Sequence, residues 1–285
     1  MSTRIDIRKS FIAGTWYPGT RDELARMVDD LLARVPTPSA QTEPLALIAP
    51  HAGYAYSGQT AAYAYKQLSN RDFDRVVILG PSHSEDFGAF AISAKKFYAT
   101  PLGDVELDAD FILELESKLR VTRVPNDREH SLEIQLPFLQ RVLSSFKIIP
   151  IMLSRPFYIV GPDAYTHCQK LAFALAEMAK TRRFLIIASS DLAHLNDYAT
   201  VKHNDAQFAE LLRAYDIAKL VEYMWEENIC RACGDTAIIT ALLAAKQLGA
   251  QRVEIFSRTN SGDVTGNRAA GQYTVGYLAA GVYKS

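Results

Sequence analysis

Three of the six histidines, His51, His83 and His194, each come shortly after a short apolar run of the kind that forms a buried strand. In open α/β sheets, ligands bind beyond the carboxyl ends of the strands, so histidines from three separate strands are expected to converge on one pocket. A proline shortly before His51 and before His83 stiffens the loop that presents each ring. Rings held in this way suit metal ligands or a catalytic base.

The segment Cys230-Arg-Ala-Cys233 directly precedes a predicted helix. A thiol in this place feels the positive end of the helix dipole, which favours the thiolate that binds metal or attacks electrophiles. Imidazole and thiolate together suit zinc, copper or iron rather than magnesium or calcium. A thioredoxin-like redox pair and half of a zinc knuckle are the alternatives. The sequence has no second Cys-x-x-Cys, which argues against a structural zinc site.

A further polar segment runs from Asp127 to Glu133, and within it Glu129, His130 and Glu133 cluster at the opening of another predicted helix. These side chains are candidates for the pocket lining or for contacts that support its ligands. Their simpler interpretation is that of carboxylates placed at a helix start, where they favour the positive end of the dipole. His167 and His203 lie on helical patterns without such a cluster, and we expect them to have no role in the site.

Short, nearly continuous apolar runs alternate with helical patterns along the chain. The predicted strands are residues 45–49, 75–79, 147–153, 184–188 and 252–256, with a further strand at 273–283 that forms an edge or pairs with 252–256. The predicted helices are 21–34, with a capping box from Thr20 to Glu23, then 57–68, 109–119, 131–144, 163–180, 204–224 and 235–248, the last ended by Gly249. The alternation predicts an α/β fold with a mixed or parallel central sheet between helical layers.

The chain of 285 residues fits one domain, because α/β units often reach about 250 residues. The one Pro/Ser/Thr-rich stretch, residues 36–44, lies between a predicted helix and a predicted strand and is typical of a connecting loop. We therefore expect a single domain over residues 1–285.

The composition excludes several classes of partner. Lys and Arg number 31 against 32 Asp and Glu, a balance without the basic excess of nucleic-acid binders or polybasic membrane anchors. No stretch reaches the about 18 apolar residues of a membrane span, and the charged N-terminus is unlike a signal peptide. Three cysteines are too few for a disulfide scaffold and fit a reducing compartment. We expect a cytoplasmic protein.

The motifs occur in an order that resembles the Memo family (mediator of ErbB2-driven cell motility), whose prokaryotic members are also called AmmeMemoRadiSam system protein B. The resemblance extends from Ala13 to Tyr283. It is carried by Ala13-Gly-Thr-Trp-Tyr17, His51-Ala-Gly-Tyr54, Gly80-Pro-Ser-His83, Glu129-His-Ser-Leu-Glu133, Ser189-Ser-Asp-Leu-Ala-His194, Cys233-Gly and Ser261-Gly-Asp263.

The resemblance implies a fold similar to class III extradiol dioxygenases, non-haem iron(II) enzymes whose metal is held by two histidines and a carboxylate. In Memo proteins a cysteine is the third ligand, so the matching motifs imply His51, His83 and Cys233 as metal ligands here. Asp191 and His194 match positions that flank the metal, where the histidine acts as acid and base. Iron(II) is the expected cofactor. A thiolate ligand suits copper and zinc as well.

The sequence departs from the family pattern beside the implied ligand. Family members commonly continue Cys-Gly-Arg with a proline shortly after, whereas this chain continues Cys233-Gly-Asp-Thr-Ala and carries the extra Cys230. Cys230 is a candidate redox partner, because it could capture an oxidised Cys233 as a disulfide and so release metal.

Two functions of different classes compete. In the first, the protein is a metal-dependent redox enzyme that binds a small molecule and O₂, and His194, oriented by Asp191, moves protons. Glu129, His130 and Glu133 then line the pocket or support its ligands.

In the second, the same cleft holds a peptide or another ligand without turnover, with Tyr54, Tyr56 and Trp16 as the aromatic contact surface. Peptide recognition ranks lower, because no Arg-rich cluster near the motifs could clamp a phosphate. Hydrolysis at zinc is a third hypothesis, with Asp191 as the one clear carboxylate base. The family name also implies a functional link to AMMECR-type and radical S-adenosylmethionine proteins.

Overall fold

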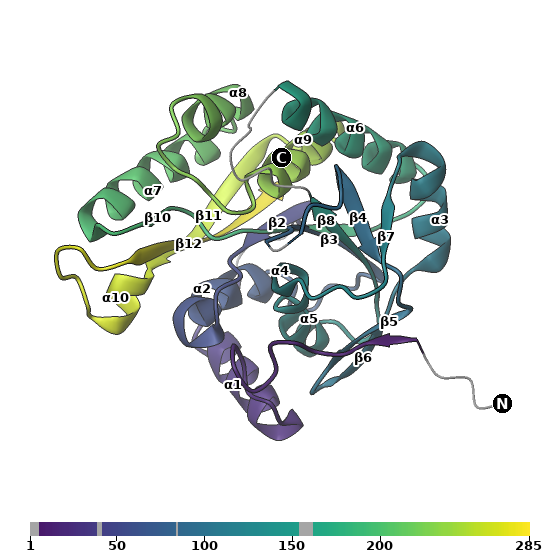
Figure 1. Ribbon diagram of the computed structural model, residues 1–285, viewed down its shortest axis with the longest axis horizontal. Coiled ribbons are helices and arrows are strands. Elements are labelled where there is room, and N and C mark those ends of the chain that lie inside the picture. The colour runs from purple at the N-terminus through teal and green to yellow at the C-terminus, as the bar shows by residue number, and fades with distance from the viewer. Residues whose placement is uncertain (1–5, 39–41, 84, 154–161) are drawn as a thin grey trace.

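Most of the predicted apolar runs form the strands of one large sheet (Figure 1). The computed structural model describes residues 6–38, 42–83, 85–153 and 162–285. Its strands are β1 (Ile7–Arg8), β2 (Ala46–Ala49), β3 (Arg75–Pro81), β4 (Phe90–Ser93), β5 (Phe97–Thr100), β6 (Gly103–Glu106), β7 (Thr122–Val124), β8 (Lys147–Leu153), β9 (Leu185–Ser189), β10 (His194–Leu195), β11 (Arg252–Asn260) and β12 (Thr274–Tyr283). Its helices are α1 (Arg21–Ala33), α2 (Tyr54–Lys66), α3 (Ala109–Lys118), α4 (His130–Glu133), α5 (Leu136–Val142), α6 (Pro162–Met178), α7 (Tyr198–Arg213), α8 (Ile217–Val221), α9 (Asp235–Gln247) and α10 (Ser261–Thr265), with a π-helical turn at Glu222–Glu226.

The main sheet is mixed. Its strands follow the order β10-β12-β2-β9-β3-β8-β4-β7, and β11 pairs with β12. The central strands β2, β9, β3 and β8 are all parallel, whereas β12 and β4 run antiparallel to their neighbours β2 and β8. A smaller sheet contains β1, β5 and β6. The C-terminal strand is therefore the antiparallel partner of β11, one of the two arrangements that the sequence left open.

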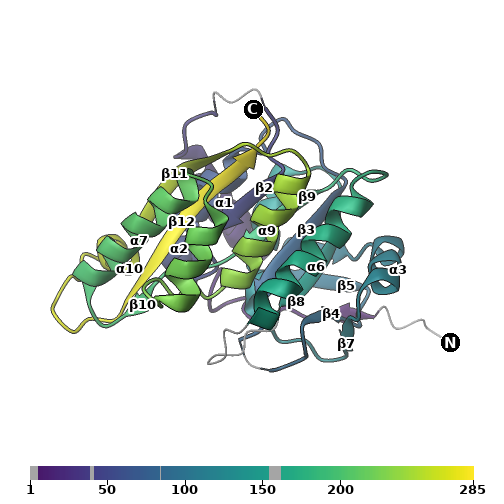
Figure 2. The same cartoon turned by 90° about the horizontal axis from the view of Figure 1, so that it is seen from above.

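Helices cover both faces of the main sheet. In Figure 1, α6, α7 and α9 lie above it, and α1, α2 and α5 lie below it. Figure 2 shows α9 and α6 running side by side across one face. The protein is a single α/β domain, as the alternation of patterns predicted.

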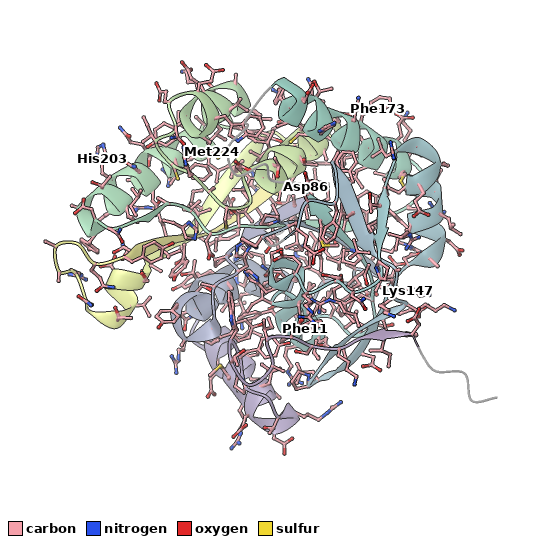
Figure 3. The ribbon with its side chains drawn as sticks, in the orientation of Figure 1. Phe11, Asp86, Lys147, Phe173, His203 and Met224 are labelled. Atoms are coloured by element: carbon pink, nitrogen blue, oxygen red, sulfur yellow. The ribbon has the colours of Figure 1, made fainter. Side chains whose placement is uncertain are left out.

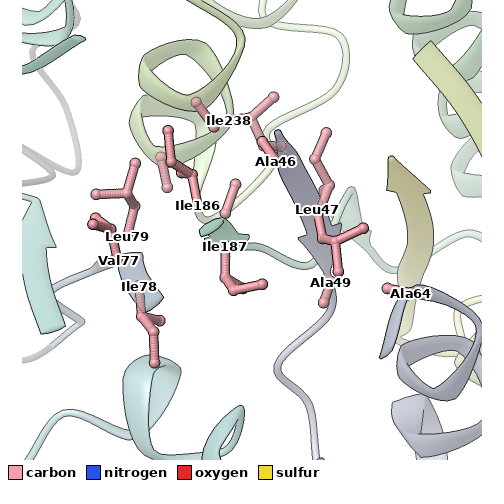
Figure 4. Packing of buried hydrophobic residues seen from close by; sticks show 14 of the residues in the cluster. Ala46, Leu47, Ala49, Ala64, Val77, Ile78, Leu79, Ile186, Ile187 and Ile238 are labelled. Atoms are coloured by element: carbon pink, nitrogen blue, oxygen red, sulfur yellow. The ribbon is translucent and has the colours of Figure 1, made fainter. Parts of the chain in front are cut away.

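The central strands are buried on both faces, which explains why they lack a polar alternation. Ile186 points toward α9, where Ile238 packs, and the next residue, Ile187, points to the opposite face (Figure 4). Burying one such side chain contributes about 1.5–3 kcal/mol. Exposed side chains such as Phe173 lie at the periphery (Figure 3). None of the helices in the described ranges is both long and apolar enough to cross a bilayer.

Helix α1 has nearly the predicted bounds, but the predicted capping box does not form. The Thr20 hydroxyl donates to the Glu23 carboxylate at 2.6 Å, and the Thr20 side chain accepts no backbone N–H bond. The two side chains therefore hydrogen-bond to each other, and Thr20 leaves the backbone N–H groups at the start of α1 without its cap.

Two predicted helices are interrupted, which corrects the sequence interpretation. Residues 131–144 form α4 and α5, because Pro137 stands at the start of α5 and cannot donate a helical hydrogen bond to the turn before it. Residues 204–224 contain the end of α7, then α8 and part of the π-helical turn, with a break at Tyr215, whose φ is 55°. Apolar spacing continues across both breaks because the pieces pack on the same core.

Six short strands, each two to four residues long, were not predicted from the sequence: β1, β4, β5, β6, β7 and β10. Such short segments cannot display a period. Within the predicted loop 36–44, residues 39–41 lie outside the described ranges.

A buried carboxyl group joins β12 to α7. Asp205 accepts the backbone N–H of Ala193 at 3.2 Å, and the Cys230 thiol donates to the same oxygen at 3.6 Å. The other oxygen has no hydrogen-bond partner among the described residues and lies over Gly276, where a Cβ would come within 1.7 Å of it. Burial raises the pKa of Asp205 to about 7. Gly276 is therefore required by close approach of a side chain, not by its backbone angles.

We predict that Asp205→Asn flattens the pH dependence of stability between about pH 4 and pH 7. In this window the folded wild type retains a proton that the unfolded chain has released, so its stability falls as pH rises, by up to a few kcal/mol. The asparagine cannot titrate. Urea unfolding at several pH values measures the effect. Asp197→Asn, at the exposed start of α7, is the control and should keep the wild-type slope in this window. Equal slopes for wild type and Asp205→Asn would contradict the prediction.

Candidate metal centre

Strand register brings His51 next to Asp191. Ala49 of β2 is paired with Ser189 of β9, and the two strands are parallel, so the residues that follow them leave the sheet side by side. One oxygen of Asp191 accepts the backbone N–H of His51 at 2.8 Å and that of Ala52 at 3.3 Å. Both residues are buried. The carboxylate therefore fixes the loop that presents the His51 ring.

The ring of His51 lies between a hydroxyl and a thiol. Its Nδ1 is 3.0 Å from Ser189 Oγ, and its Nε2 is 2.8 Å from Cys233 Sγ. The Asp191 N–H donates to the same sulfur at 3.1 Å, and the Cys233 N–H donates to Asp191 O at 3.2 Å. The next residue is glycine because a Cβ on Gly234 would come within 2.3 Å of the Ser189 carbonyl oxygen.

The His51 imidazole is held in its neutral form. Burial, together with the nearby rings of His83, His130 and His194, holds its pKa well below 6.5. Neutral imidazole is the form that binds metal, so the site does not have to lose a proton from this ring before an ion enters.

Glu129 organises the second and third rings of the cluster. Its carboxylate accepts the His83 N–H at 2.6 Å, lies 2.9 Å from His83 Nδ1 and 3.2 Å from His130 Nδ1, and caps α4 by accepting the Ser131 N–H at 2.9 Å. Burial by itself would raise the pKa of Glu129, but the hydrogen bonds from His83 and the charges of His83 and His130 lower it to about 2. Burial lowers the pKa of His130 to about 4. The ionised carboxylate thus lies beside the Nδ1 atoms of both rings.

Behind Glu129 lies a buried ion network centred on Arg8. The Arg8 guanidinium donates to Asp127 at 2.9 Å, to the Glu129 carbonyl oxygen at 2.6 Å and to the Glu133 carboxylate. Glu133 also accepts from the Tyr17 hydroxyl at 2.7 Å. These groups bind one another far from solvent, which anchors β1 and the segment after it against the loop that holds Glu129.

An open cavity of about 780 Å³ lies over the histidines. It is lined by Thr15, Trp16, His51, Ala52, Gly53, Tyr56, His83, His130, Asp191, His194, Ser261, Gly262, Thr265, Asn267, Gln272, Tyr273, Val275 and Tyr277. Antiparallel β12 begins at the edge where the parallel strands end, so the segment around α10 closes one side. The Nδ1 of His194 lies 2.9 Å from Leu192 O, which can only accept, so Nδ1 carries the proton and Nε2 is the basic nitrogen.

The structure places the predicted residues in two environments. His51, His83, His130, His194, Asp191, Trp16 and Tyr56 line the cavity. Tyr54, Glu129 and Glu133 are buried, with the Tyr54 hydroxyl donating to Ile134 O at 2.7 Å. Cys230 and Cys233 are both buried, and neither is in a disulfide with another described residue.

Two overlapping groups could hold a metal, and both include His51. The ligand atoms of His51, His83 and His130 lie within 4.8 Å of one another, and the same holds for His51, Asp191 and Cys233. The combination of His51, His83 and Cys233 takes two members from each group and stays a prediction. His167 lies elsewhere, in edge contact with Phe90.

Several residues of the site were missed by the sequence analysis. Arg8 had no signal, because single charged residues near the chain start are common. Asp127 opened the polar segment that runs to Glu133 but was given no role. Asn267, Gln272, Tyr273 and Tyr277 line the cavity beside Ser261-Gly-Asp263, a motif that was noted but given no role. The position of this motif shortly before the last strand was the signal that could have predicted its place beside the cavity.

Fold and site together define an α/β protein with a buried His/Cys/Asp group at strand ends that could bind a metal. The chain belongs to the Memo-like protein family, which matches residues 8–281. A MEMO1 family protein of Nitrosopumilus maritimus is 34% identical over 281 residues, which cover 96% of this chain and 98% of that protein. Members from Methanocaldococcus jannaschii and Thermotoga neapolitana are 33% and 34% identical over 293 and 288 residues, with 96% of this chain covered in each case and 98% and 99% of theirs. The resemblance inferred from the motifs is confirmed.

We predict that Arg8→Ala destabilises the fold by about 3–5 kcal/mol, because it leaves the carboxylates of Asp127 and Glu133 buried without their cation. Urea unfolding measures the loss. Arg141→Ala is the matched control: its pair with Asp29 lies on the surface, and its removal should cost at most about 1 kcal/mol. Similar losses for the two variants would show that the Arg8 network does not anchor the fold.

Proposed function

We propose that the protein is a metal-dependent redox enzyme whose ion is iron(II), held by His51, His83 and Cys233, with copper or zinc as alternatives. The observation that carries the proposal is one open cavity that three imidazoles, Asp191 and His194 line together. Imidazole nitrogens and a sulfur donor fit these metals by their softness. Iron(II), when bound, would supply Lewis acidity and electrons to a small molecule in the cavity, whereas zinc would supply Lewis acidity alone.

The acid and base of the proposed reaction are His194 and Asp191. The basic Nε2 of His194 takes a proton from a substrate hydroxyl and returns it later. Asp191 accepts two backbone N–H bonds, and burial raises its pKa to about 7, a value suited to proton exchange near neutral pH. Its main part is to hold the His51 loop in place.

The walls of the cavity favour an uncharged or aromatic guest. Trp16, Tyr56 and Tyr273 are 36%, 47% and 53% exposed and line the cavity. The lining residues given above include no lysine or arginine, so a phosphate group would enter without a cationic partner. A small aromatic molecule is therefore preferred over a phosphorylated peptide.

The second candidate is a binding module that uses the same cleft without turnover. The exposed aromatic side chains favour it, because tyrosine and tryptophan offer a large contact area with a polar tip. We also propose, from family membership, a functional link to AMMECR-type and radical S-adenosylmethionine proteins and a cytoplasmic location.

We predict that anaerobically purified protein contains iron and consumes O₂ with catechol-like substrates. His194→Gln should keep its iron and lose about 100-fold or more of the rate, because only the proton transfer is removed. His203→Gln, on the exposed side of α7 (Figure 3), should match wild type. Elemental analysis and an oxygen electrode give both values. A protein with full metal occupancy that consumes no O₂ with any substrate would favour the binding module.

We predict that peroxide lowers the metal content reversibly through Cys230. Peroxide takes two electrons from the Cys233 sulfur and gives a sulfenic acid. The Cys230 thiol then displaces water to form a disulfide, which a dithiol reduces again. Elemental analysis before and after treatment follows the metal. Cys230→Ser should lose the reductant-dependent recovery, and Cys168→Ser, another buried cysteine, should retain it. Identical behaviour of Cys230→Ser and wild type would remove the basis of this mechanism.

A further inference from the structure

His130 has the geometry of a third imidazole ligand. The ring of His130 stacks on His83 at 4.5 Å between centroids and meets His51 edge-on at 5.5 Å, while His51 and His83 are 5.2 Å apart. Each ring offers a ligand atom within 4.8 Å of the others. The three rings thus surround one point, although they come from the ends of two strands and the start of a short helix.

Each ring is held through its Nδ1, so Nε2 is the nitrogen that could face an ion, and on His51 this Nε2 also lies 2.8 Å from Cys233 Sγ. Nδ1 of His51 contacts Ser189, and the Nδ1 atoms of His83 and His130 lie within 3.2 Å of one carboxylate oxygen of Glu129. A carboxylate oxygen favours the tautomer that carries its proton on the adjacent nitrogen. Nε2 of His83 and of His130 is then an unprotonated donor. A carboxylate behind a ligating histidine is the usual support of a metal site.

The imidazole rings and the Cys233 sulfur differ in their position relative to the cavity. All three rings line the cavity, whereas Cys233 is absent from its lining residues. Cys233 Sγ reaches the cluster through its 2.8 Å contact with His51 Nε2. An ion open to a small molecule in the cavity is therefore faced by three imidazoles.

We infer that His130 is a further metal ligand, so that the centre offers three imidazoles on the cavity side in addition to the Cys233 sulfur. The ligand role of His130 rests on the proposed function only in that the centre must bind a metal. His130 is not among the ligands that the family motifs imply. The ion it would take is a divalent first-row metal, for which imidazole nitrogen is a favoured donor.

The competing interpretation is that His130 only packs, since Trp16 lies 4.3 Å from it, ring to ring. His130→Phe separates the two roles, because it keeps a flat ring between Trp16 and His83 but removes the donor nitrogen. Trp16→Phe is the matched variant, because it alters the packing and keeps the donor. His203→Phe, at an exposed histidine, controls for the loss of any histidine.

Cobalt(II) added to metal-free protein is the probe. The hyperfine-shifted proton NMR spectrum should show three exchangeable imidazole N–H signals in wild type, Trp16→Phe and His203→Phe, and two in His130→Phe.

Chelator competition gives the affinity of each variant for cobalt(II), which should be roughly 10- to 100-fold weaker for His130→Phe than for wild type. With Cys233→Ser as background, His130→Phe should cause the larger loss, because fewer donors remain. Circular dichroism and thermal unfolding confirm that each variant is folded, and His130→Gln serves if the phenylalanine is not tolerated.

Each failure has its own signature. Wild type that binds no cobalt would overturn the proposed metal-dependent function together with this inference. Wild type that binds cobalt with two imidazole signals, or His130→Phe with unchanged signals and affinity, would overturn the ligand role of His130 and leave the proposed function standing.

Discussion

The Glu129 carboxylate is the interaction on which the candidate centre depends. It is buried and yet ionised, because the His83 backbone and ring and the Ser131 N–H all donate to it. By holding Nδ1 of two rings, it decides which nitrogen each ring turns toward the cavity. Removing this carboxylate would leave the tautomers of His83 and His130 undetermined.

A single buried cation, Arg8, pairs with two of the three carboxyl groups behind the centre. Arg8 bonds to the side chains of Asp127 and Glu133 and to the main chain of Glu129. The local balance of formal charge is therefore negative, next to the imidazole rings. A metal cation held by those rings would offset this charge at short range, in a region of low dielectric constant where the interaction is strong. The negative charge also disfavours an anion in the cavity, and the lining residues include no lysine or arginine that could pair with one.

Close packing beside the Asp191–His194 segment restricts which substitutions the chain can accept there. Asp205 contacts Cys230 and Gly276 and accepts the backbone N–H of Ala193, within the Asp191–His194 segment. Cys230 thus has a place in the fold as a thiol donor to Asp205, whatever redox chemistry it carries out. The departure from the family pattern at this residue lies in the support of the loop that carries Asp191 and His194.

The sequence by itself determined the α/β class and the apolar strands, since continuous apolar runs are a local signal. Prolines before histidines and a thiol before a helix made His51, His83 and Cys233 candidates, and the resemblance to the Memo family implied them as one ligand set. It could not show that 131–144 breaks at Pro137 or that 204–224 breaks at Tyr215, because the apolar spacing passes through both breaks. Only the tertiary structure decided that His130 joins the rings, that Arg8 lies behind Glu129 and that Cys233 sits against His51 outside the cavity lining. These relations join residues far apart in the chain, and their distances follow from strand register and packing, which no local pattern encodes.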